Sequence, residues 1–171
     1  MKVFDVAAIQ DILKSLVRGR VGALNLSVNV RIQHFDADGN LIDEELQHNI
    51  ITDAGCAHVA DQLASSHDES EMNHMAVGTD DTAEAADDTA LGSESDRQAL
   101  SSRTQGSGGD DHKVTYSASF TGLTDTLTEA GIFNDASVGT MLARVTYGAK
   151  TMEADETIQF DWTLTAADDG S

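Results

Sequence analysis

The side chains best suited to chemistry are the histidines and carboxylates between residues 67 and 74. His67, Asp68, Glu69, Glu71 and His74 carry imidazole and carboxylate groups, the groups that bind zinc in proteins. The six histidines of the chain nevertheless include no HxH or HExxH pair, the spacings that place two ligands on one metal ion. We therefore interpret this stretch as a solvated acidic loop and predict no metal-binding residues.

A second cluster of carboxylates, Asp36-Ala37-Asp38-Gly39-Asn40, resembles the beginning of a calcium loop because it has oxygen donors at positions 1, 3 and 5. The rest of that loop does not fit. Leu41 stands where a calcium loop has glycine, and Gln47 stands where it has a bidentate glutamate. The spacing favours a hairpin turn that needs no metal.

No arrangement of nucleophile and base can be assembled from the sequence. None of the serines lies in a GxSxG elbow, and Gly106-Ser107-Gly108-Gly109 lacks the Lys-Ser/Thr pair of a phosphate-binding loop. Cys56 is the only cysteine, which excludes an intramolecular disulfide, and with no basic neighbour in the sequence it is predicted to be a small core residue. The sequence thus predicts no catalytic residues and no cofactor, and we expect a protein that is not an enzyme.

The charge balance restricts the partners and the environment. Thirty acidic residues against ten basic ones give a net charge of −20, which destabilises a compact state in dilute buffer and is screened in molar salt. This composition indicates a halophilic source, because an acidic mimic of nucleic acid would carry its carboxylates in blocks. Binding to nucleic acid is disfavoured, no apolar run approaches the length of a membrane span, and Asp5 stands where a signal peptide would be apolar.

The first 22 residues are predicted to form an N-terminal helical arm. The apolar residues Val6, Ile9, Leu13 and Leu16 recur at three- and four-residue spacing, which is typical of an amphipathic helix. Gly19 and Gly22 then separate this helix from the strands that follow. Two interpretations stay open: the helix packs on its own domain, or it is an arm that docks on a neighbouring subunit.

Residues 23–171 are predicted to form one mainly β domain, an antiparallel β-sandwich of jelly-roll-like type. Leu24 to Ile32 alternate apolar and polar residues, a period that only a half-buried strand explains. The same alternation recurs at 114–120, 141–147 and 158–164, and Leu41 to Ile51 is predicted to form the second strand. Strands of this length and spacing favour a sandwich.

The middle of the chain is predicted to hold one short helix and a long loop-rich insertion. Thr52 is a suitable N-cap for a helix to Ser65, and we expect Cys56, Val59, Ala60 and Leu63 to face inward. The insertion covers residues 66–111 and contains one short strand at 75–78. So long a loop in a compact domain indicates a functional task or a partner.

Six segments, in order along the chain, resemble a family of structural proteins from tailed viruses. They are Asn49-Ile50-Ile51-Thr52-Asp53-Ala54-Gly55, His74 to Thr82, Asp88-Thr89-Ala90-Leu91-Gly92, Leu127 to Asn134, Met141-Leu142-Ala143-Arg144 and Trp162-Thr163-Leu164-Thr165. Asp80 replaces the glycine that is usual in the second segment. The glycines suit turns and close backbone approaches, and Glu129 is suited to capping or hydrogen-bonding a loop. These features are folding determinants rather than catalytic groups.

The resemblance implies a virion structural protein, assembled in the host cytoplasm and located in the virion. The expected function is capsid decoration: a homo-oligomer that binds the outside of the viral head and contacts the major capsid protein or neighbouring virion proteins. The alternative is a tail-tip or fibre module that adheres to the host surface, possible partners there being surface glycans. The acidic, lysine-poor composition makes a virus of halophilic archaea the expected source. The absence of long repeats or heptads favours decoration over a fibre.

Overall fold

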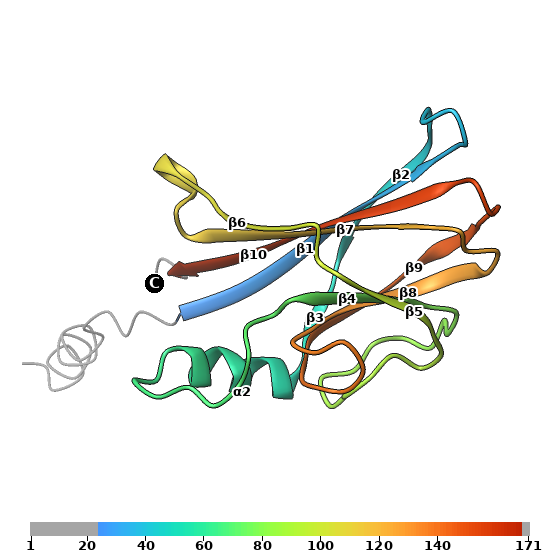
Figure 1. Ribbon diagram of the computed structural model, residues 1–171. Coiled ribbons are helices and arrows are strands. Elements are labelled where there is room, and N and C mark those ends of the chain that lie inside the picture. The colour runs from blue at the N-terminus through green and yellow to red at the C-terminus, as the bar shows by residue number, and fades with distance from the viewer. Residues whose placement is uncertain (1–23, 169–171) are drawn as a thin grey trace, which may run out of the picture.

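The computed structural model describes residues 24–168 and consists of two antiparallel five-stranded sheets packed face to face, with one α-helix at one end (Figure 1). The elements are β1 (Leu24–Phe35), β2 (Leu41–His48), β3 (Ile50–Ile51), α2 (Asp53–Gln62), β4 (His74–Gly78), β5 (Glu94–Ala99), β6 (Ser102–Gln105), a 3₁₀ helix (Gly108–Asp110), β7 (Lys113–Thr121), β8 (Thr126–Phe133), β9 (Met141–Thr151) and β10 (Thr157–Asp168). The predicted mainly β antiparallel sandwich is confirmed. The helical arm predicted over residues 1–22 lies outside the described residues and stays a prediction.

The first sheet has the strand order β2-β1-β10-β7-β6. Its alternating sequences place every second side chain inward, so Val30 of β1 lies opposite Trp162 of β10, and Trp162 lies opposite Tyr116 of β7. The rings of Phe120 and Phe160 meet edge to face with centroids 6.1 Å apart. These strands therefore supply most of the aromatic rings of the core between the sheets, and Tyr147 of β9 packs against Phe160 from the second sheet.

The second sheet has the order β3-β9-β8-β4-β5 and is buried on both of its faces over β4, β8 and β9. Its inner face contributes Met75, Val77 and Ile132 to the main core. Its outer face carries a separate small apolar cluster of Ala76, Leu91, Phe133 and Met141. A sheet face can be apolar only if something covers it, and here the cover is the chain between β4 and β5.

The topology resembles a jelly roll in that the chain passes repeatedly between the sheets and its first and last strands pair. It differs in that the hairpins β1–β2, β4–β5, β6–β7 and β8–β9 each stay within one sheet.

Two predicted boundaries differ from the structure. The strand predicted over 41–51 is two strands in different sheets, because the chain crosses at Asn49 from the edge of the first sheet to pair Ile50 with Arg144 of β9. The insertion over 66–111 is less loop-rich than predicted, since β5, β6 and a 3₁₀ helix lie within it besides β4. β5 and β6 are polar edge strands without apolar alternation, so the sequence pattern does not reveal them.

Helix α2 confirms one prediction and corrects another. The Thr52 hydroxyl accepts a hydrogen bond from Gly55 N at 2.9 Å, the geometry of an N-cap. The predicted inward face holds only for Val59, which is partly buried and packs against the main core. Cys56, Ala60 and Leu63 are exposed, and Gly55 and His58 are buried instead. A Cβ atom at position 55 would collide with the carbonyl oxygen of Leu142, so the closest approach of the helix to β9 is made at this glycine.

Within residues 24–168 no helix has the length and apolar character needed to cross a membrane.

Candidate functional site

The candidate site is the segment between β4 and β5, residues 79–93, which is held in place by hydrogen bonds to a buried carboxylate. We call this segment the anchored loop. It has no regular secondary structure, yet its backbone is tied to the second sheet by the buried carboxylate of Glu129 on β8. That carboxylate accepts hydrogen bonds from the backbone N–H groups of Ser93 at 2.8 Å, Gly92 at 3.0 Å and Asp80 at 3.3 Å. Both ends of the loop are thus fixed by one side chain, and the expectation that Glu129 hydrogen-bonds a loop is confirmed.

Arg144 of β9 neutralises Glu129 and connects it to the middle of the loop. Its Nε donates to Glu129 Oε2 at 2.9 Å, and its terminal NH2 nitrogen lies equally close to that oxygen without the geometry of a hydrogen bond. Its NH1 donates to Asp88 Oδ2 at 2.9 Å, and the same oxygen accepts the N–H of Ala85. The result is a buried Glu129–Arg144–Asp88 network.

The charges of this network stabilise one another. Burial alone would lower the pKa of Arg144, but its hydrogen bonds to Asp88 and Glu129 outweigh burial and raise it. Burial would raise the pKa of Asp88, whereas the N–H of Ala85 and the guanidinium of Arg144 lower it. Both pKa shifts favour the charged forms of Arg144 and Asp88 at neutral pH.

Two glycines allow the loop to approach so closely. A Cβ atom at Gly78 would lie 2.5 Å from Glu129 Oε1, and one at Gly92 would collide with the carboxylate of Asp80. Asp80 accepts the N–H of Thr82 at 2.7 Å, and hydrogen bonds from the side chain and the backbone of Thr82 lower its pKa. The Asp80 carboxylate thus closes a local turn with Thr82.

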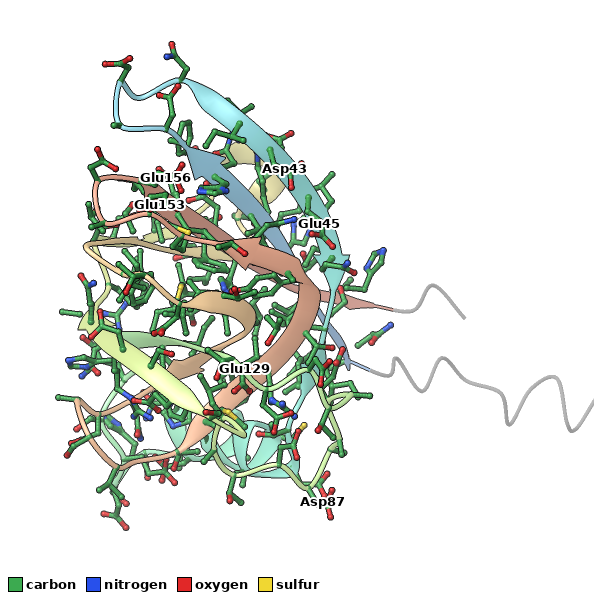
Figure 2. The ribbon with its side chains drawn as sticks, turned by 90° about the vertical axis from the view of Figure 1, so that its right-hand side faces the viewer. Asp43, Glu45, Asp87, Glu129, Glu153 and Glu156 are labelled. Carbon is green, nitrogen blue, oxygen red and sulfur yellow. The ribbon has the colours of Figure 1, made fainter. Side chains whose placement is uncertain are left out.

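The network is suited to holding the loop in place and not to proton transfer. The oxygens of Glu129 already accept three backbone N–H groups and the Arg144 guanidinium, so neither oxygen is available as a general base. The network itself is covered by the anchored loop, and the surface that other molecules can reach is the outer side of this loop, where Asp81 and Asp87 are exposed. Figure 2 shows Glu129 in the interior and Asp87 at one end of the molecule.

The stretch 67–74 lies beside helix α2. Asp61 of α2 accepts the backbone N–H groups of Asp68 and Glu69, and Glu69 lies 3.0 Å from His58 Nδ1. The ring Nδ1 of His74 is hydrogen-bonded to the side-chain oxygen of Asn73. The histidines and carboxylates of this stretch are therefore not brought together, and among residues 24–168 no three His, Cys, Asp or Glu side chains are grouped as metal ligands.

The turn at Asp36 is the predicted hairpin turn. The Asp36 carboxylate accepts the side-chain and backbone N–H groups of Asn40 and the N–H of Asp38, and these contacts lower its pKa. Gly39 has a φ of +82°, the conformation that favours glycine. The carboxylate thus closes its own turn.

A second ionic group, which sequence reasoning missed, joins the two sheets at the other end of the molecule. Lys150 of β9 contacts Asp43 and Glu45 of β2, each at 2.7 Å, and near it His34 pairs with Glu156 at 2.9 Å. Figure 2 shows this group of carboxylates at the end opposite Asp87. Each of its pairs joins residues that are more than 100 positions apart in sequence, so no local signal identifies it.

A cleft of about 500 Å³ opens between helix α2 and the first sheet. We call it the α2 cleft, and its apolar lining consists of Leu24, Leu26, Val28, Ile50, Ile51 and Cys56. A smaller one of about 170 Å³ lies beside Val59, Leu63, Tyr116 and Leu164. Cys56 was expected in the core and instead lines the α2 cleft.

No protein-family model, curated protein or solved structure matches this chain.

Proposed function

We propose that this chain is a structural protein of a tailed virion, and that it decorates the outside of the viral head as a homo-oligomer. One observation carries the proposal: five of the six sequence segments that resemble virion proteins meet at the second sheet. Glu129 and Arg144 come from two of them, Gly78 and Asp80 from a third, and Asp88 and Gly92 from a fourth. Thr52, from the fifth, donates a hydrogen bond to Met141 O at 2.6 Å.

This convergence supports an architectural role. Together the segments form one structural feature, the anchored loop, which is held rigidly on a sheet. A rigid loop presents the same surface to every partner. Ordering the loop before binding reduces the entropy lost when it contacts a neighbouring protein. A decoration protein, which must occupy many equivalent positions on a shell, would use such a surface.

The distribution of aromatic rings favours decoration over adhesion to glycans. Within residues 24–168 most of the rings, those of Trp162, Phe120, Phe133, Phe160 and Tyr147, are buried, and Phe35 and Tyr116 are partly buried. Sugar-binding surfaces rely on exposed rings whose amphipathic faces stack on the ligand. The described surface is instead rich in carboxylates, which supports a protein that works in brine.

The test is the abundance of the protein in purified virions of its source, measured by quantitative mass spectrometry. We expect a copy number comparable to that of the major capsid protein, and removal of the protein should leave tails intact. A few copies per particle would favour the tail-tip or fibre alternative and refute decoration. Absence from virions would refute both.

The contact surface is tested by rebinding recombinant protein to particles from which the native protein has been removed. Asp87→Lys reverses a charge on the anchored loop, and Glu153→Lys makes the same change at the opposite end of the molecule (Figure 2). We expect only Asp87→Lys to weaken rebinding, with both variants equally folded by circular dichroism. Equal rebinding by the two variants would show that the anchored loop is not the contact surface.

A further inference from the structure

The first sheet continues past the end of the core, and its inner face is left open there. Leu24 and Leu26 continue the inward series of Val28 on β1, and Leu164 continues that of Trp162 on β10. Val28 is only 3% exposed, whereas Leu24 is 62% exposed although the alternation places it on the same face. Apolar side chains on the core face of a sheet normally have a partner layer opposite them.

That partner layer is missing because the second sheet stops short. β3 consists only of Ile50 and Ile51, and the chain then turns into α2, which lies along β9. The close approach of Gly55 to Leu142 draws α2 toward the second sheet. Figure 1 shows β1 and β10 extending over α2, and the α2 cleft occupies the space between them.

The segment that immediately precedes Leu24 has the properties of the missing layer. Val6, Ile9, Leu13 and Leu16 would share one face of a helix. Only residues 18–23 separate that face from Leu24, and six residues span at most about 20 Å. Since Leu24 itself lines the α2 cleft, the segment can reach the cleft without rearrangement of the sheets.

Charge favours the same pairing. Residues 1–22 contain four basic and two acidic residues and therefore carry +2, which leaves −22 on the rest of the chain. A basic segment is attracted to an acidic domain, while in molar salt this attraction is screened within about 3 Å and apolar contact must hold the segment. The exposed Leu24 and the partly buried Leu26 of the cleft supply that contact.

We propose that the α2 cleft is the docking site for residues 3–17 of the same chain, whose apolar face covers Leu24, Leu26, Ile50 and Ile51. Attachment through a short linker gives the segment an effective concentration in the millimolar range, which favours its own cleft over that of another copy. The docked segment completes the sandwich at the end where the second sheet stops. This inference does not depend on a role in the virion.

Cys56 reports on the occupancy of the cleft in the full-length chain, because it is the only cysteine and lines the α2 cleft. We expect a maleimide to label Cys56 about tenfold more slowly in the native chain than in an Ile9→Asp/Leu13→Asp variant, whose apolar face is disrupted. Ser15→Asp adds a charge to the opposite face of the segment and should leave the rate unchanged. Equally fast labelling of all three proteins would overturn the proposal.

Cross-linking identifies which copy supplies the segment. Ile9→Cys places a second thiol on the apolar face, and in dilute full-length protein we expect oxidation to join it to Cys56 within one chain, giving a monomer on a non-reducing gel. Asp11→Cys, on the polar face, should cross-link far less. A disulfide-linked dimer would show that the segment of a second copy occupies the cleft, and would refute docking within one chain. If Ile9→Cys cross-links to Cys56 no more than Asp11→Cys does, docking of the segment in the cleft is refuted altogether.

Discussion

Replacement of Glu129 by glutamine tests whether the buried network holds the anchored loop. Glutamine keeps the shape of the side chain and one carbonyl oxygen, but it removes the charge that neutralises Arg144 and places an NH₂ group among backbone N–H donors. Breaking a buried ion pair by altering one partner costs about 3–5 kcal/mol. Because Arg144 keeps Asp88, whose side chain is partly exposed, we expect the lower end of that range, about 3 kcal/mol or about 6–12 °C in Tm for a chain of this size.

The assay is urea unfolding in molar salt, followed by circular dichroism. Glu153→Gln is the matched control, since it makes the same chemical change at an exposed position and should alter the free energy of unfolding by less than about 0.5 kcal/mol. The double variant Glu129→Gln/Arg144→Met should be more stable than the sum of its single changes predicts, because neither of the two most buried groups is left charged without the other; Asp88 loses Arg144 but is partly exposed.

Hydrogen exchange provides a second readout for Glu129→Gln. The amides of Asp80, Gly92 and Ser93 donate to Glu129, so they should exchange faster in the variant, while amides of β10 should change only as far as global stability does. If Glu129→Gln and Glu153→Gln unfold at the same urea concentration with the same exchange rates, the network does not fix the loop.

Three further predictions concern the whole fold. Since the net charge is −20, lowering the salt from molar to about 0.01 M, where the Debye length reaches about 30 Å, should weaken the β-sheet circular dichroism signal; an unchanged signal would contradict the interpretation as a halophilic protein. Trp162→Ala and Phe160→Ala, at fully buried positions, should each cost about 3–5 kcal/mol in urea unfolding, and Asp161→Ala less than about 1 kcal/mol; similar losses at all three would contradict the strand register. Because the pKa of Asp88 is lowered from its ordinary value of 3.8, the ionised Asp88 stabilises the fold above that pH, and this stabilisation is lost as the pH falls through the folded pKa. In molar salt the free energy of unfolding should therefore decline below about pH 4. The Asp88→Asn variant should show a smaller decline.

The sequence alone determined the features that depend on local periodicity and local hydrogen bonding. Alternation from Leu24 to Ile32 and from Ile158 to Leu164 specifies strands whose inward side chains include Trp162, and the structure buries that residue completely. Thr52 caps α2 and Asp36 closes its turn because each needs only neighbours within a few residues. Such contacts can be predicted because the chain itself brings the partners together.

Tertiary structure decided the features that depend on which elements lie opposite one another. Glu129, Arg144 and Asp88 come from three separate segments, and their pairing requires the β8–β9 register and the path of the loop. The buried face of α2 is set by the contact of Gly55 with β9, which overrides the apolar pattern that predicted Cys56 and Leu63 inward. Leu24 alternates like a core residue, but it lies in an open cleft because the second sheet ends at Ile51. Periodicity states which face of an element is apolar, whereas only the arrangement of the other elements determines whether that face is covered.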